Sequence, residues 1–360
     1  MKILLFIDSL GSGGAQRQIV GLATMLKEKG YGVKMVTYYD IPFYKHQLEM
    51  NDVGYYNITV GRKLLPRLLK LRRVIDNYRP DVVISFLDTP CILACINKAL
   101  GGNWRLIVSE RNTTQFLSRH DKMKFFVFRW ADAIVSNSFS QKAFIDEHFP
   151  SFRKKSIVIP NFVDMNEFTF NDRKRRNNNI IVAASIWESK NTLGMIEAVK
   201  ILRQRGISLN VKWLGISQII TPYIRKCQHL INEYQLNGLF SLCQKTKYIA
   251  SEYKQADFFC LPSFYEGTSN ALCEAMASGL PILCSNVCDN PIYVKEGWNG
   301  FLFDPHNPVE IADKIEQMLR IPDDEYVHYC INSRSIAEKM LSEERFIEGF
   351  LKLIENDYFS

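Results

Sequence analysis

Two glutamates, Glu266 and Glu274, flank a short stretch of hydroxyl and amide side chains. Residues 257–261 are mostly apolar and stop at Pro262, which predicts a short buried strand. The polar cluster after Gly267 and the following helix formers, which end at Gly279, predict a helix. The order is therefore strand, loop and helix, with one carboxylate in the loop and the other in the helix.

The start of this helix is a predicted anion site, because the first backbone N–H groups of a helix have no partner within it. The residues that we expect to contribute are Gly267, Thr268, Ser269, Asn270, Ala271 and Leu272. Carboxylates do not bind phosphate, but they accept hydrogen bonds from sugar hydroxyls. N–H groups that donate to phosphate, between two carboxylates that accept from hydroxyls, fit a nucleotide sugar. The alternative is that both glutamates are solvated charges on an ordinary strand-to-helix crossover.

The same stretch resembles the E-x7-E region of the retaining glycosyltransferases of family 4, which have the GT-B fold. The matching elements are Leu261-Pro262-Ser263, Glu266-Gly267, Asn270, Leu272 and the run from Glu274 to Pro281. The resemblance implies an α/β protein with two Rossmann-like, doubly wound domains that face each other across a cleft. It also implies that Glu266 binds the hydroxyls of the donor sugar and Glu274 those of the ribose.

A glycine-rich loop, Gly11-Ser12-Gly13-Gly14, lies between a first apolar strand and an amphipathic helix. It is not a dinucleotide-binding fingerprint, since the third glycine of that motif would fall at Gln16. The loop resembles the S-G-G-A-E-R loop of family 4, with Gln16 in place of the acid. By this resemblance Gly13, Gly14 and Arg17 close over the donor phosphates and the acceptor.

The second half of the chain departs from the family at one position. Family 4 members carry an arginine and a lysine that hold the donor diphosphate. Lys190-Asn191 match the lysine element, but Ser185 stands at the arginine position. A single cation would stabilise a departing diphosphate less well than two. We therefore expect Lys190 to act together with the helix-start amides and Arg17.

Strands and helices alternate through both halves, which predicts parallel sheets whose ligands bind beyond the carboxyl ends of the strands. In the first half this rule selects Asp88, Glu110 and Arg111 as acceptor-binding residues; simple loop capping is the alternative. We expect an acceptor domain over residues 1–163, a donor domain over 164–342 and a helix over 343–360 that returns to the first domain. The polar stretch 171–179 is interpreted as the interdomain connection.

Composition is that of a globular protein, with 47% hydrophobic and 23% charged residues among 360. No apolar run is long enough to span a membrane. The nine cysteines form no C-x-x-C pair and their number is odd, which favours reduced thiols and a cytoplasmic location.

Residues 1–165 hold 24 Lys and Arg against 14 Asp and Glu. Two segments there, 62–73 and 119–130, mix cations with leucines or aromatic residues. Each could lie on an anionic membrane, on its inner face, and each could equally be a helix with a solvated basic face. No nucleic-acid-binding module accompanies the charge, so nucleic acid is not an expected partner.

The sequence thus predicts a retaining glycosyltransferase that moves a sugar from a nucleotide sugar, most simply a UDP-sugar, to a glycan. A polyprenyl-diphosphate-linked acceptor of a bacterial envelope suits the basic first half. No cofactor or metal is expected, because no His, Asp and Glu cluster has ligand spacing. Two alternatives stay open: a GT-B protein that binds sugar or nucleotide without catalysis, and a sugar-nucleotide epimerase.

Overall fold

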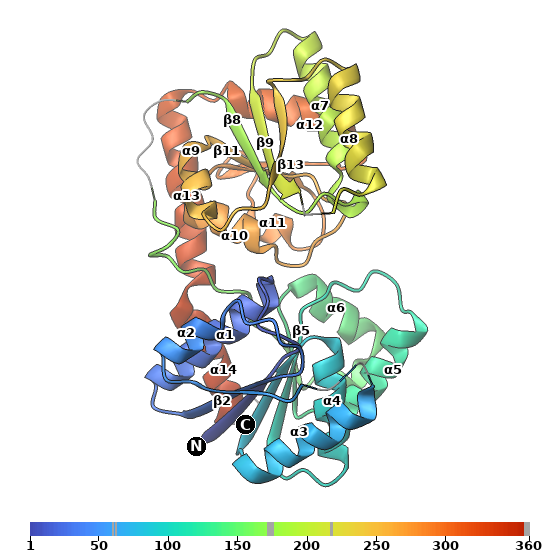
Figure 1. Ribbon diagram of the computed structural model, residues 1–360. Coiled ribbons are helices and arrows are strands. Elements are labelled where there is room, and N and C mark those ends of the chain that lie inside the picture. The colour runs from blue at the N-terminus through green and yellow to red at the C-terminus, as the bar shows by residue number, and fades with distance from the viewer. Residues whose placement is uncertain (60, 62, 171–175, 217–218, 356–360) are drawn as a thin grey trace. The chain divides into compact units, whose positions relative to one another are not determined.

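The computed structural model describes residues 1–59, 61, 63–170, 176–216 and 219–355. The chain forms two units, each with its own sheet (Figure 1). The first unit is Met1–Phe162 together with Glu343–Ser360, and the second is Val163–Ser342.

The first unit is a seven-stranded parallel sheet in the order β3-β2-β1-β4-β5-β6-β7. Its strands are β1 (Lys2–Phe6), β2 (Gly32–Thr37), β3 (Gly54–Asn57), β4 (Val82–Phe86), β5 (Arg105–Glu110), β6 (Ala133–Ser136) and β7 (Ser156–Val158). Its helices are α1 (Gly14–Glu28), α2 (Lys45–Met50), α3 (Leu64–Tyr78), α4 (Asp88–Ala99), α5 (Arg119–Val127), α6 (Phe139–His148) and α14 (Glu343–Ile354).

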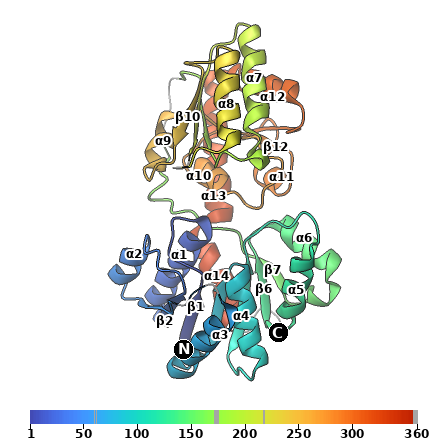
Figure 2. The ribbon, with the colours of Figure 1, turned by 45° about the vertical axis from the view of Figure 1, so that its right-hand side comes forward.

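Both faces of this sheet are covered, as the continuous apolar runs of its strands require. One apolar core contains residues of α1, α2 and α14, and the other contains residues of α3, α4, α5 and α6. Figure 2 shows α3, α4 and α5 on the same side of the sheet. The final helix α14 buries Phe346, Phe350 and Leu353 in the first of these cores.

The second unit is a six-stranded parallel sheet in the order β10-β9-β8-β11-β12-β13. Its strands are β8 (Asn179–Ala183), β9 (Asn210–Ile216), β10 (Phe240–Gln244), β11 (Phe258–Leu261), β12 (Ile282–Ser285) and β13 (Gly300–Phe303). Its helices are α7 (Thr192–Gln204), α8 (Pro222–Glu233), α9 (Ile249–Gln255), α10 (Asn270–Ala277), α11 (Asn290–Tyr293), α12 (Pro308–Leu319) and α13 (Asp323–Leu341).

One feature of the predicted organisation, the position of the interdomain connection, needs correction. The chain passes between the units at Phe162 and Val163, so the polar stretch 171–179 is not the connection. Residues 171–175 lie outside the described residues, and Asn177 and Asn179 bind the Asp257 carboxylate through their backbone N–H groups, both at 2.9 Å. These contacts place the end of the stretch within the second unit. Polarity alone did not distinguish a domain boundary from a surface loop.

Candidate active site

Lys190 and Glu266 meet at the carboxyl ends of two adjacent strands of the second sheet. Lys190 ends a short 3-10 turn that follows β8, and Glu266 lies in the loop between β11 and α10. Strands β8 and β11 are parallel neighbours, so the two loops start at the same edge. The Lys190 ammonium forms an ion pair with Glu266 Oε1, and both side chains are largely buried.

One backbone hydrogen bond joins the two loops, and one side-chain hydrogen bond within the second loop orients Glu266. The Phe264 N–H donates to the Ser189 carbonyl oxygen at 2.9 Å, and Ser263 Oγ donates to Glu266 Oε1 at 2.8 Å. Asn191, next to Lys190, takes a left-handed conformation with φ of 56°, and its Oδ1 accepts from the Gly194 N–H at 3.1 Å. Asparagine tolerates this conformation and caps helices well, which explains the Lys-Asn pair at the start of α7.

The start of α10 has the form that the sequence predicts, with one difference. Ser269 is the N-cap, and its hydroxyl accepts from the Leu272 N–H at 3.5 Å. The Leu272 amide is therefore already bonded within the cap, so an anion at the helix start would have to bind the amides that precede it. The Thr268 hydroxyl donates to Asp289 Oδ2 at 3.4 Å and its side chain is buried, so this hydroxyl is engaged within the fold.

Glu274 lies on α10 and is 6% exposed. Its Oε2 accepts a hydrogen bond from the Tyr253 hydroxyl at 3.4 Å. A carboxylate so enclosed can accept hydrogen bonds from a ligand only where the ligand displaces part of these contacts. Glu266 therefore lies in the loop before α10 and pairs with the Lys190 ammonium. Glu274 lies within α10 and accepts from the Tyr253 hydroxyl.

In the first unit, the glycine loop leads into α1, which begins after Gly13. A side chain at Gly13 would place its Cβ 2.2 Å from Gln16 Oε1, so the Gln16 side chain would have to move to accommodate it. Gln16 Nε2 donates to Asp8 Oδ1 at 3.0 Å and ties the helix to the end of β1. The closing of Gly13, Gly14 and Arg17 over a donor stays a prediction.

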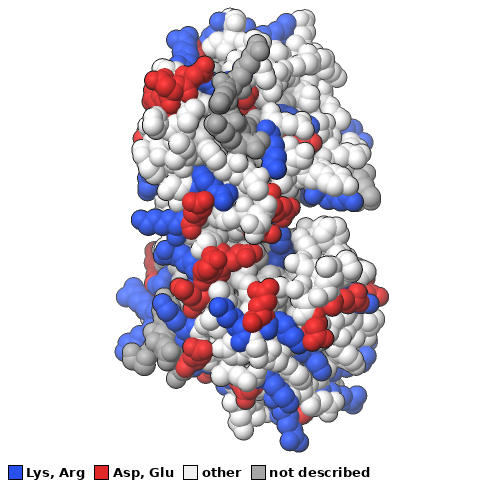
Figure 3. Space-filling model, turned by 90° about the vertical axis from the view of Figure 1, so that its left-hand side faces the viewer, with Lys and Arg blue, Asp and Glu red and all other residues white. Residues whose placement is uncertain are grey.

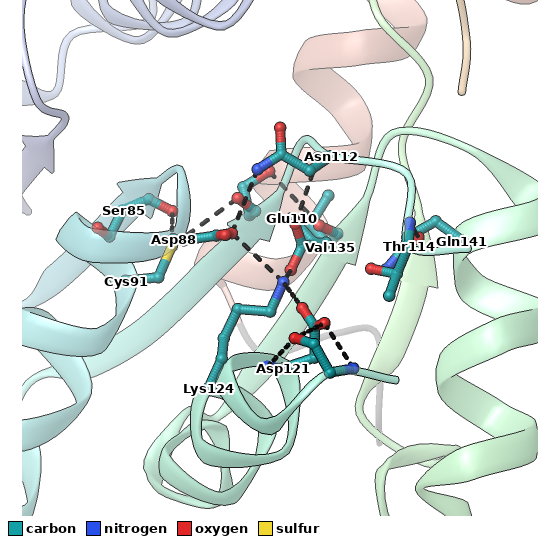
Figure 4. Close-up of polar contacts among 12 residues, drawn as sticks. Ser85, Asp88, Cys91, Glu110, Asn112, Thr114, Asp121, Lys124, Val135 and Gln141 are labelled. Atoms are coloured by element: carbon teal, nitrogen blue, oxygen red, sulfur yellow. Dashed lines mark hydrogen bonds and ion pairs between the residues drawn. The ribbon is translucent and has the colours of Figure 1, made fainter. Parts of the chain in front are cut away.

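Asp88 and Glu110 meet in a buried ionic cluster around a lysine that the sequence analysis placed on a surface (Figure 4). Asp88 begins α4, Glu110 ends β5, and Lys124 lies on α5. The Lys124 Nζ atom lies 2.7 Å from Glu110 Oε2, 3.3 Å from Asp88 Oδ1 and 3.6 Å from Asp121 Oδ1. Lys124 and Glu110 are each 1% exposed.

Burial raises the pKa of Glu110 to about 7, although Lys124 opposes the rise. Burial also lowers the pKa of Lys124, but Glu110 and Asp88 outweigh it and the net shift is upward. One ammonium faces three carboxylates, so the cluster holds a proton more tightly than an isolated glutamate does. A direct contact of Glu110 with an acceptor would require it to leave Lys124.

Arg111 follows Glu110 and stacks on an aromatic ring. Its guanidinium carbon lies 4.0 Å from the centre of the Phe86 ring, and its Nη1 donates to Asn161 Oδ1 at 2.8 Å. Burial lowers the pKa of Arg111 to about 9. Within the described residues its Nε and Nη2 atoms are buried without a hydrogen-bond partner, so two donors are available to an oxygen-rich ligand.

Sequence reasoning missed Lys124 because the segment 119–130 looked like an amphipathic surface helix. The signal was present: Lys124 shares the buried side of its helix with Phe125 and Phe128. In the described part of the chain no group of three or more His, Cys, Asp and Glu side chains could hold a metal ion. Over the same residues, no helix is both long and apolar enough to cross a membrane.

The chain is similar to known glycosyltransferases along nearly its full length. It is 26% identical to a Campylobacter jejuni protein named GalNAc-alpha-(1->4)-GalNAc-alpha-(1->3)-diNAcBac-PP-undecaprenol alpha-1,4-N-acetyl-D-galactosaminyltransferase, over 98% of both chains. It is 23% identical to an Escherichia coli UDP-Gal:alpha-D-GlcNAc-diphosphoundecaprenol alpha-1,3-galactosyltransferase, over 78% of this chain and 76% of that protein.

Solved structures show the same fold. The crystal structure of Anabaena Alr3699/HepE in complex with UDP and glucose superposes with a TM-score of 0.85 at 16% identity, over 99% of both chains. A glycosyltransferase from Rickettsia africae gives the same TM-score at 16% identity, over 99% of this chain and 98% of that one. Both are GT-B neighbours of the two parallel-sheet units described above.

Two family models together span residues 12–335. The model described as Glycosyltransferase Family 4 matches residues 12–167, and the model described as Glycosyl transferases group 1 matches residues 164–335. The resemblance seen around Glu266 is thus confirmed over both units, and the chain belongs to the family 4 glycosyltransferases.

Proposed function

We propose that this glycosyltransferase moves a sugar, with retention of anomeric configuration, from a UDP-sugar to a glycan carried on a polyprenyl diphosphate. The observation that carries the proposal is the Lys190–Glu266 ion pair beside the start of α10. It puts a cation, helix-start amides and a carboxylate at one edge of one sheet. These are the groups that a diphosphate and a sugar need.

A bound donor would exchange the partners of this pair. Its diphosphate would replace Glu266 as the counter-ion of Lys190, and Glu266 would then accept hydrogen bonds from the donor sugar. As the bond to the diphosphate breaks, Lys190 and the amides before Leu272 would stabilise the growing negative charge on the leaving oxygen. Glu274 would turn from Tyr253 toward the ribose hydroxyls. Since cations and amides of the chain supply this stabilisation, the reaction is proposed to need no metal.

The acceptor would contact Asp88 and Arg111. Arg111 offers two unpartnered donors, and Asp88 is the partly exposed member of the Lys124 cluster, with 27% of its side chain exposed. Glu110 would act indirectly, by holding Lys124 and Asp88 in place. The leaving phosphate would take the proton of the acceptor hydroxyl. Relatives named for diphospho-undecaprenol acceptors support a lipid-linked substrate.

A lipid-linked acceptor requires contact with a membrane, and we assign this contact to the outer side of α5, on the inner face of the cytoplasmic membrane. Met123 and Phe126 are exposed on the helix whose inner side carries Lys124, Phe116 is exposed just before that helix, and the Arg129 guanidinium after it stacks on the Phe126 ring. Apolar side chains beside a cation suit the interface of an anionic membrane. On the face drawn in Figure 3, basic and acidic side chains are mixed.

The test is a transfer assay with UDP- and GDP-sugars and a polyprenyl-diphosphate-linked glycan acceptor. We expect transfer from one UDP-sugar, and its loss in Glu266→Gln. The matched control is Glu325→Gln, which removes an exposed glutamate from the same unit. Donor binding without transfer or hydrolysis, or a new sugar isomer released without acceptor, would contradict the proposal.

The membrane contact is tested separately by pelleting with vesicles of phosphatidylglycerol or phosphatidylcholine. We expect Met123→Ser with Phe126→Ser to weaken pelleting with the anionic vesicles. Equal pelleting of the unaltered chain with both kinds of vesicle would contradict the contact.

A further inference from the structure

A polar cavity lies in the first unit, away from the strand ends that carry Asp88 and Glu110. It has a volume of about 410 Å³ and lies between α3 and the strands β1, β2 and β3. Four of its lining residues are cations, and two are tyrosines: Lys2, Lys34, Lys70, Arg73, Tyr56 and Tyr78. Lys2 begins β1, so the cavity extends to the amino-terminal end of the sheet. The transfer reaction uses the opposite end.

The cations are held around the cavity by the fold. Lys34 is opposite Leu4 in the sheet register, and the Leu4 side chain packs in the core under α3. The Lys34 ammonium lies 4.6 Å from the centre of the Tyr78 ring, and the Lys2 ammonium lies 5.6 Å from it. From the helix, the Lys70 ammonium donates to the Thr59 carbonyl oxygen at 3.2 Å.

These four cations differ from several others of the first unit in their partners. Among the described residues none of the four side chains forms an ion pair, although many other lysines and arginines of the chain do. The nearby Asp81 accepts instead from the Lys2 backbone N–H, at 2.7 Å. Like charges that share a cavity repel one another, and an anion bound among them would remove that repulsion.

We propose that this cavity binds a phosphate group, as a phosphomonoester or phosphodiester, independently of the sugar donor. Lysine and arginine donors around a cavity of this volume suit an oxyanion. Tyr56 and Tyr78 line the same cavity.

Two exposed leucines on α3 indicate where such a phosphate would come from. Leu65, Leu69 and Arg73 recur at intervals of four residues and therefore form one row along the helix. Leu65 is 65% exposed and Leu69 is 54% exposed. A lipid headgroup in the cavity would bring its acyl chains toward this row, whereas a free phosphate would not use the leucines.

The test compares two probes on the full-length chain. Glycerol 3-phosphate, followed by calorimetry, represents a free phosphomonoester; vesicles of phosphatidylcholine with or without phosphatidylglycerol represent the lipid source. The altered chain is Lys70→Glu with Arg73→Glu, both at exposed positions. The control, Lys29→Glu with Lys154→Glu, makes the same change of net charge at exposed positions of the same unit.

We expect the cavity variant to bind phosphate-bearing probes about tenfold or more weakly than the control variant, and added salt to weaken binding to the unaltered chain. If Leu65→Ser with Leu69→Ser weakens vesicle binding only, the source is a lipid. If the double leucine variant binds both probes as the unaltered chain does, and glycerol 3-phosphate binds, the source is a free phosphate. Equal binding of the cavity and control variants to both probes overturns the proposal. These binding assays contain no sugar donor and no glycan acceptor, so their result is independent of the transfer assay.

Discussion

Lys190 and Glu266 are 76 positions apart in the sequence and form an ion pair at the carboxyl ends of β8 and β11. Each therefore serves as the counter-ion of the other in the chain without a ligand. A donor that carries both a diphosphate and sugar hydroxyls offers a replacement partner to each. The two side chains can therefore pair either with each other or with the donor, and we expect transfer to need both of them.

Replacing Lys190 tests the role of the cation. Lys190→Ala should lower kcat/KM for the donor by about 10²–10³, since it removes a fixed charge from the leaving diphosphate. Steady-state kinetics measures the change, with thermal unfolding to show that the fold persists. Lys200→Ala, which removes another partly exposed lysine of the second unit with a glutamate partner, is the control and should change little. Equal rates for both variants would remove Lys190 from the mechanism.

Ser185 permits a test by gain of function. Ser185→Arg would restore the second cation that family members carry, and we expect kcat/KM for the donor to rise, about tenfold, as the diphosphate gains a second partner. Ser185→Gln has a long polar side chain without the charge and is the control. A rise in both variants would show that side-chain length matters and the charge does not.

Lys124 should be the most important charge for the stability of the first unit. Lys124→Met leaves Asp88, Glu110 and Asp121 without their shared cation, and we expect a loss of about 3–5 kcal/mol in the free energy of unfolding. Urea unfolding measures it. Adding Glu110→Gln to this variant should recover part of the loss, because it removes the most deeply buried carboxylate. No recovery would mean that the cluster is not electrostatically coupled.

The pH dependence of stability should report on Glu110. Burial raises its pKa from 4.5 to about 7, so between these pH values the folded chain holds a proton that the unfolded chain has lost. The free energy of unfolding therefore falls as pH rises through this window, by about 3 kcal/mol at most, and the loss is complete above it. In Glu110→Gln this fall should vanish. Glu28→Gln, at an exposed position, should keep it.

The last helix should be part of the first core. Phe350 is fully buried, 6.1 Å from the centre of the Phe86 ring and 5.1 Å from that of Phe346. Phe350→Ala should cost about 3–5 kcal/mol of unfolding free energy, as a large cavity in a packed core does. The control is Lys352→Ala on the solvent side of the same helix. Denaturant unfolding followed by circular dichroism would show an equal midpoint for both if α14 were not part of this core.

The sequence revealed local features and left some long-range ones hidden. The short apolar runs identified the central strands, and the Ser269-to-Gly279 pattern identified α10, because caps and periodicity are local properties. Lys124 was hidden, since nothing in its own segment shows that two strand ends supply its carboxylates. That Lys190 and Glu266 serve one donor site was expected only through the family resemblance, and their ion pair was not predicted. The stretch 171–179 was wrongly interpreted as the interdomain connection, because a polar surface loop and an interdomain connection have the same composition.

The first unit is interrupted in the chain: it stops at Phe162 and is completed only from Glu343 onward. On the ribosome, its nascent sheet must therefore wait for the whole of Val163–Ser342 to be translated, roughly ten to forty seconds at ordinary rates, before α14 covers its apolar face. The second unit comes from one uninterrupted stretch and can mature first. The first unit therefore finishes folding after the second, because its apolar face stays uncovered until α14 has been made.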